Sequence, residues 1–158
     1  MGMDVYGKNP ENETGRYFRA SVWGWHPLAE YLVEVAPNLM GKVTYLHSND
    51  GDGLGPEDSV ALATALQQAL TSGHTAAYVQ ARDEAIAALP RLTCRFCEGT
   101  GTRSDEVGVR LGFTARNWCN GCDGKGDTES WEASYSLDAS RVREFAAFVR
   151  QSGGFEIW

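Results

Sequence analysis

The sequence predicts an α+β fold with three or four helices, a small sheet and one inserted zinc-binding hairpin module of four cysteines. Three observations favour this class. Apolar residues recur at helical spacing in four segments, other short segments have the composition of strands, and all four cysteines fall in two close pairs. With 158 residues and 42% hydrophobic content, the chain is long enough for a single domain over 1–158, with the zinc module at 92–127.

The N-terminal part is predicted to contain two strands and one helix. Residues 4–6 are expected to form a short strand, and residues 7–12 a loop, because glycine and Asn-Pro favour turns. Pro27 suits the first turn of a helix over 27–36, and residues 43–47 are expected to form another strand. The apolar stripe of that helix comprises Leu28, Tyr31, Leu32 and Val35.

Two further helices are predicted in the middle of the chain. Pro56 opens the first, the carboxylates of Glu57 and Asp58 complement the helix dipole, and Gly73 ends it. The second extends over 75–89. The two segments form either an antiparallel pair or one bent continuous helix. Their inward-facing residues are Leu62, Leu66, Ala69 and Leu70 in the first and Tyr78, Val79, Ile86 and Leu89 in the second.

The last third is predicted to contain a hairpin arm, a strand, a helix and a terminal strand. Residues 107–111 alternate weakly and suggest the hairpin arm, whereas 128–137 alternate clearly and predict a half-buried strand. Asp138 is a natural N-cap for a helix that ends near residue 151, and 155–158 are expected to dock as a short strand. The inward face of 128–137 comprises Trp131, Ala133, Tyr135 and Leu137.

All four cysteines lie in two copies of the pattern C-x-x-C-x-G-x-G, the first starting at Cys94 and Cys97 and the second at Cys119 and Cys122. Four thiolates at this spacing can surround one Zn²⁺ tetrahedrally, which leaves no coordination position for a catalytic water. The glycines permit positive φ and let backbone N–H groups point at the sulfurs. The sequence therefore predicts one structural Zn²⁺.

Disulfides, a redox dithiol and four unrelated buried thiols are the alternatives to zinc. Disulfides need an oxidising compartment, whereas the N-terminus shows neither the basic nor the apolar region of an export signal, and no stretch approaches a membrane span. A redox dithiol usually involves one C-x-x-C at the start of a helix, not two copies followed by glycines. We therefore expect a cytoplasmic protein that has no membrane partner.

The duplicated motif resembles the cysteine-rich zinc domain of DnaJ-type co-chaperones and the small anti-TRAP regulators. The resemblance covers about residues 92–127, less than a quarter of the chain, and the two motifs present are enough for one zinc. The His-Pro-Asp tripeptide of a J-domain does not occur, so the co-chaperone activity that depends on it is not implied. In both families the zinc fold mainly serves protein contacts, which implies a binding role here.

The charge distribution weighs against simple binding of nucleic acid. The net charge is −7, with −6 in residues 1–90, +2 in 91–126 and −3 in 127–158. One Zn²⁺ with four thiolates adds about −2 to the basic segment. The arginines of that segment either form a stripe beside Phe96 and Phe113 or pair with neighbouring acidic residues. The stripe would comprise Arg91, Arg95, Arg103, Arg110 and Arg116.

Two other groups of residues are candidate sites. Trp23 and Trp25 are either partner-binding anchors or core residues. Asp50 and Asp52 resemble part of a calcium loop, and with His47 they could form a second site, although Ser59 stands where that loop needs a bidentate glutamate. The alternative for this segment is an acidic turn before a helix.

The sequence favours a zinc-stabilised protein-interaction or regulatory protein without catalytic activity. Three histidines, a closed metal sphere and the lack of a phosphate loop or nucleophile motif argue against an enzyme. One alternative is an acidic inhibitor, encoded by a phage or mobile element, that mimics nucleic acid. The other is an RNA- or DNA-binding zinc protein, which would need a basic face.

Overall fold

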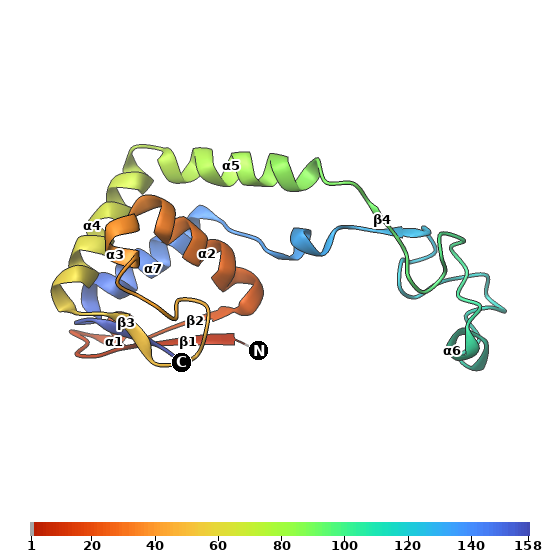
Figure 1. Ribbon diagram of the computed structural model, residues 1–158, viewed down its shortest axis with the longest axis horizontal. Coiled ribbons are helices and arrows are strands. Elements are labelled where there is room, and N and C mark those ends of the chain that lie inside the picture. Colours follow the sequence, from red (N-terminus) through yellow and green to blue (C-terminus); the bar gives the residue numbers. More distant parts are fainter. Residues whose placement is uncertain (1) are drawn as a thin grey trace. The chain divides into compact units, whose positions relative to one another are not determined.

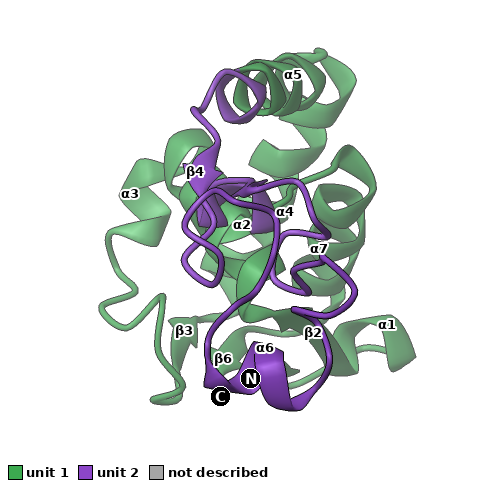
Figure 2. Ribbon diagram, turned by 90° about the vertical axis from the view of Figure 1, so that its right-hand side faces the viewer, with its two compact units in different colours: residues 1–84, 135–158 green, residues 85–134 purple. Residues whose placement is uncertain are grey.

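A computed structural model describes residues 2–158 and divides the chain into two compact units (Figures 1 and 2). Unit 1 comprises residues 1–84 and 135–158, and unit 2 comprises residues 85–134, which include all four cysteines. The described residues contain seven α-helices and small antiparallel sheets, which confirms the α+β class. None of these helices is both long enough and apolar enough to cross a membrane.

Unit 1 contains a four-stranded antiparallel sheet in the order β2-β1-β6-β3. The central pair aligns Val5 with Ile157, and Val5 is also opposite Phe18 in the neighbouring strand. The strands predicted at 4–6 and 155–158 are confirmed as β1 and β6, whereas β2 and β3 were not predicted. The bounds are β1 Gly2–Gly7, β2 Tyr17–Ser21, β3 Asp52–Leu54 and β6 Phe155–Ile157.

Four long helices confirm the helices predicted from apolar spacing. Pro56 begins the second of the predicted helices, and Asp138 caps the last helix by accepting a hydrogen bond from the backbone N–H of Arg141 at 2.8 Å. Gly73, with φ of +85°, separates two distinct helices, so the middle segments are not one continuous helix. The long helices are α2 Val22–Val35, α4 Pro56–Thr71, α5 His74–Ala87 and α7 Ala139–Gln151. Two short helices, α1 Glu13–Arg16 and α3 Pro37–Met40, were not predicted.

The core of unit 1 lies between the sheet and helices α2, α4 and α7, which cover one of its faces (Figure 1). Aromatic rings fill its centre. Phe145 of α7 meets Phe18 of β2 edge-on at 5.0 Å between ring centroids, and it meets Trp25 of α2 at 5.9 Å. Such edge-to-face contacts stabilise a core beyond the burial of apolar area.

Helix α2 begins five residues earlier than predicted. The hydroxyl of Ser21 accepts a hydrogen bond from the N–H of Gly24 at 3.2 Å, so Ser21 rather than Pro27 marks the start. Pro27 therefore lies inside the helix, where it lacks the N–H that would bond to the preceding turn.

The prediction of a strand at 43–47 is wrong, because side chains form hydrogen bonds with the backbone groups that a strand would use for pairing. The Asp52 carboxylate accepts hydrogen bonds from the N–H groups of Thr44 and Tyr45 at 2.6 and 2.9 Å. The indole N–H of Trp25 donates to the carbonyl of Leu46 at 2.8 Å. These contacts hold the segment as a series of turns.

Two predictions for segments between residues 107 and 137 are also wrong. The expected hairpin arm at 107–111 is a short helix, because Asp105 caps it by accepting from the N–H of Gly108 at 2.8 Å. The expected strand over 128–137 is interrupted, and of its four inward-facing residues only Leu137 is buried. The observed elements are β4 Leu92–Thr93, α6 Glu106–Arg110, β5 Asp127–Thr128 and a 3₁₀ helix, Trp131–Ser134, with β4 and β5 forming an antiparallel pair.

Two tryptophans that are two residues apart provide a test of the core. Trp25 is fully buried, whereas Trp23 is 48% exposed. We expect Trp25→Ala to lower the free energy of unfolding by about 3–5 kcal/mol, because it opens a cavity and leaves the Leu46 carbonyl without its donor. Trp23→Ala, the matched control, should cost less than about 1 kcal/mol. Urea denaturation measures both changes, and equal losses would contradict this packing.

Candidate metal centre

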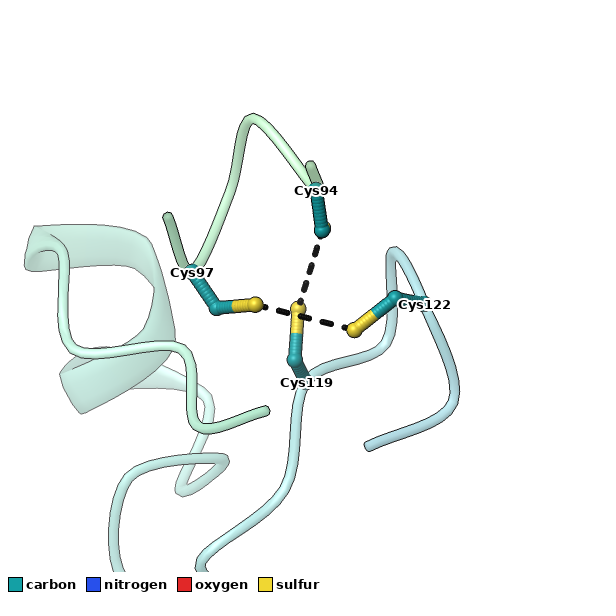
Figure 3. Close-up of side chains that lie close together, drawn as sticks. All are labelled: Cys94, Cys97, Cys119 and Cys122. Carbon is teal, nitrogen blue, oxygen red and sulfur yellow. Dashed lines mark hydrogen bonds between the residues drawn. The ribbon is translucent and has the colours of Figure 1, made fainter. Parts of the chain in front are cut away.

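The four thiols converge on one point in unit 2 (Figure 3). All four sulfur atoms lie within 4.8 Å of one another, with Cys94 Sγ 3.9 Å from Cys119 Sγ and Cys97 Sγ 3.6 Å from Cys122 Sγ. A tetrahedral ion with metal–sulfur bonds of about 2.3 Å requires sulfur atoms about 3.8 Å apart. The cysteines are buried, so the cluster predicted from the two motifs is present and suits a metal ion.

The backbone after each cysteine pair follows the same course in both motifs. The residue after the second cysteine has a positive φ in each, 50° at Glu98 and 53° at Asp123. Both glycines of each motif also have positive φ, a conformation that glycine adopts without strain. The N–H of Gly126 donates to Cys122 Sγ at 3.2 Å, which confirms the expectation that backbone N–H groups point at the sulfurs.

The two motifs also pack against each other through their glycines. A Cβ atom on Gly101 would lie 2.5 Å from the carbonyl oxygen of Gly124, and one on Gly126 would lie 2.4 Å from the carbonyl oxygen of Gly99. A hydrogen bond from the N–H of Cys94 to the Gly126 carbonyl, 2.9 Å long, joins the same two loops. The absence of side chains at these positions therefore lets the two cysteine pairs approach one ion.

The surroundings of Cys97 and Cys122 shift their thiol pKa values in opposite directions. Burial raises the pKa of Cys97, but hydrogen bonds from the N–H of Gly101 and from neighbouring groups outweigh it and bring the pKa to about 7. Burial raises the pKa of Cys122 to about 11, although the N–H of Gly126 opposes the change. A bound cation would favour the thiolate form of both.

Arg103 supplies a nearly buried positive charge close to the sulfur cluster. Its guanidinium donates to the Asp105 carboxylate at 2.8 and 2.9 Å and to Asn120 Oδ1 at 3.0 Å, and it lies 4.6 Å from the centroid of the Phe96 ring. Asp105 raises the pKa of Arg103, and the Cys119 thiolate further favours the charged form. Nothing in the spacing of the arginines along the chain distinguishes Arg103 from the others.

The residues predicted to contact a partner lie in different surroundings. Trp25 belongs to the core and cannot be reached by a partner, while Trp23 stays at the surface and packs edge-on against Tyr135 at 4.8 Å. Arg95 is exposed, with its guanidinium 4.8 Å from the Phe96 ring centroid. Arg110, the last residue of α6, and Arg116, in the following turn, are both exposed.

His47, Asp50 and Asp52 do not come together as a second metal site. Asp52 instead accepts hydrogen bonds from the backbone of residues 44, 45 and 53, and these bonds, led by that of Tyr45, lower its pKa. His47 lies beside His26 at 4.8 Å, and burial lowers the pKa of His47. Among residues 2–158, the four cysteines are the group of three or more candidate ligands placed to hold a metal ion.

No family model, curated protein or solved structure matches this chain. The likeness of residues 92–127 to the DnaJ-type domain therefore rests on the two cysteine motifs alone. The four-cysteine cluster supports the part of this likeness that concerns a metal site.

The packing of Gly101 against the other motif makes it a specific test of the centre. Gly101 and Gly112 have almost the same φ, +76° and +74°, but a Cβ on Gly112 would meet no atom within 4 Å. Both alanine variants incur the cost of a left-handed backbone, and only Gly101→Ala also forces the loops apart. We therefore expect Gly101→Ala to weaken metal binding at least about tenfold more than Gly112→Ala.

Competition with a chromophoric chelator would measure the two metal affinities. Equal affinities in the two variants would contradict the role assigned to the contact between the loops.

Proposed function

We propose that this chain is a zinc-stabilised protein-interaction or regulatory protein, without catalytic activity of its own. The observation that carries the proposal is a buried, closed four-sulfur centre in a unit that exposes apolar and basic side chains at its surface. The centre gives rigidity to the unit, and the surface makes the contact with the partner.

The donor set supports Zn²⁺ as the ion. Four thiolates in a tetrahedral arrangement are typical of structural zinc, which has no redox chemistry and no geometric preference of its own. All four positions of the ion would be occupied by sulfur, so neither water nor substrate could bind to it. Free thiols of this kind persist in a reducing compartment, and a cytoplasmic location is part of the proposal.

The proposed contact surface, here called the α6 surface, comprises Val109, Arg110, Leu111 and Arg116. Val109 is 62% exposed and Leu111 is 52% exposed, although both are large apolar side chains. Apolar side chains flanked by arginines are typical of protein-binding surfaces, where arginine and buried apolar groups contribute much of the affinity.

The α6 surface is fixed to the metal centre by contacts within unit 2. Phe113 and Trp118 pack edge-on at 5.4 Å, and the N–H of Phe113 donates to the carbonyl of Gly108 at 2.8 Å. The Thr114 hydroxyl donates to the carbonyl of Arg103 at 2.7 Å, which joins the surface to the guanidinium beside the thiols. A surface held in one conformation loses less entropy on binding.

The charge of each unit favours a protein over a nucleic acid as partner. Unit 2 holds six Lys and Arg residues against seven Asp and Glu residues, and a zinc with four thiolates adds about −2. A surface for phosphates needs an excess of positive charge, which neither unit has. Unit 1 has a net charge of −6, the charge that a mimic of nucleic acid would use instead.

The proposal is tested by two matched valine substitutions. Val109 lies on the α6 surface, whereas Val60, which is 46% exposed, lies on α4 in unit 1. We expect Val109→Glu to weaken binding of the partner at least about tenfold, and Val60→Glu to leave it unchanged. Affinity capture from cells that encode the chain identifies the partner, and titration calorimetry with that purified partner measures each affinity.

Equal binding by both variants would contradict the proposed surface. Capture of a nucleic-acid-binding protein through unit 1, lost at high salt, would favour the mimic, and salt-dependent binding of RNA or DNA by the chain would favour the third alternative. Metal content must be the same in all variants, because loss of the zinc would disturb the α6 surface indirectly.

A further inference from the structure

The sheet of unit 1 has one face covered by helices and one face without a covering element in its own unit (Figure 1). The strand register places three aromatic side chains on this second face: Tyr6, Tyr17 and Trp158. They are 47%, 44% and 50% exposed. Solvated faces of antiparallel sheets normally carry polar side chains, so three large aromatic rings there suggest a contact surface.

Neighbouring groups hold these rings in place. Tyr6 and Tyr17 are cross-strand partners with ring centroids 5.2 Å apart, and the Tyr17 hydroxyl donates to the Asp4 carboxylate. The backbone of Trp158 exchanges two hydrogen bonds of 2.7 Å with Asp4. The indole lies directly over Gly51, where a Cβ atom would come within 2.6 Å of the ring. Aromatic groups that are already ordered contribute strongly to binding, because little entropy is lost.

The charges on this face balance, although unit 1 as a whole is acidic with a net charge of −6. Lys8 pairs with Glu156 at 3.6 Å, and Arg19 pairs with Asp4 at 3.6 Å. A strongly basic or acidic partner would find no complementary charge here. A second copy of the same face would provide complementary charge, because each cation on one copy can meet a carboxylate on the other.

Side-chain contacts obstruct each edge of the sheet at one point, which favours the face over an edge for this contact. At the β2 edge, the Arg141 guanidinium donates to the carbonyl of Arg19 and lies 4.4 Å from the Phe18 ring centroid. At the β3 edge, Asp52 binds the turns of residues 44 and 45. Side chains placed in this way hinder the addition of another strand.

We infer that the outer face of this sheet is a homodimer interface, in which two copies pack sheet against sheet around a twofold axis. Such an interface brings a surface patch against its own copy and must therefore be complementary to itself in charge and shape. The balanced ion pairs and the aromatic row satisfy the charge requirement and supply the apolar area. The inference is independent of the function proposed for unit 2.

Charge reversal of one ion pair tests the interface. Lys8→Glu makes the face acidic and Glu156→Lys makes it basic. The dissociation constant of the dimer should therefore be at least about tenfold higher for each variant alone than for the wild type. An equimolar mixture of the two should dimerise again, because the reversed charges attract. Lys42→Glu is the control, since Lys42 is an exposed lysine whose ion-pair partner, at 2.8 Å, is Asp58 of helix α4.

Sedimentation velocity of the full, metal-loaded chain over a wide concentration range gives the oligomeric state, and circular dichroism confirms that each variant is folded. We expect a dimeric wild type, weakened single variants and a restored mixture. A wild type that stays monomeric throughout the range would overturn the inference. So would a dimer that both reversals leave intact, or a dimer that Val109→Glu in unit 2 abolishes.

Discussion

The convergence of four thiols on one point is the constraint on which unit 2 depends. The buried cluster of this unit consists of the four cysteines, with Phe96 packed against them. So small a cluster buries too little apolar surface to hold this unit in one conformation by itself. When a structural metal ion binds, its binding free energy is coupled to folding. A bound metal ion would therefore take the place of an apolar core in residues 85–134.

Several features of unit 2 follow from this constraint. Bringing both loops to one ion requires glycine at Gly101 and Gly126, where a side chain would meet the opposite backbone. With a divalent ion bound, four thiolates would leave two negative charges on the centre, which Arg103 would partly balance. Arg103 also connects the thiols to the α6 surface through Asp105 and Thr114. Unit 1 instead depends on apolar packing between its sheet and helices, centred on Trp25 and Phe145. The two units are thus stabilised by different interactions.

Features determined by local chemistry were predictable from the sequence. The cysteine spacing predicted the centre, and α4 and α7 were predicted because apolar spacing agrees with the capping signals at Pro56 and Asp138. The prediction of a strand at residues 43–47 failed because side chains from other parts of the chain bond to the backbone of this segment. The indole of Trp25, which donates to the carbonyl of Leu46, is one example. The contrast between Trp23 and Trp25 has the same origin, since burial depends on packing against α7 and not on residue type.

The measurement that tests the central claim most directly is X-ray absorption spectroscopy of the purified protein at the metal edge. The account predicts a zinc edge, with four sulfur scatterers at about 2.3 Å and no lighter atom in the first shell. A first shell containing oxygen or nitrogen would contradict the closed site, because it would leave a position for water or substrate. A protein without zinc, with its thiols free or oxidised, would contradict the claim that the metal holds unit 2 together.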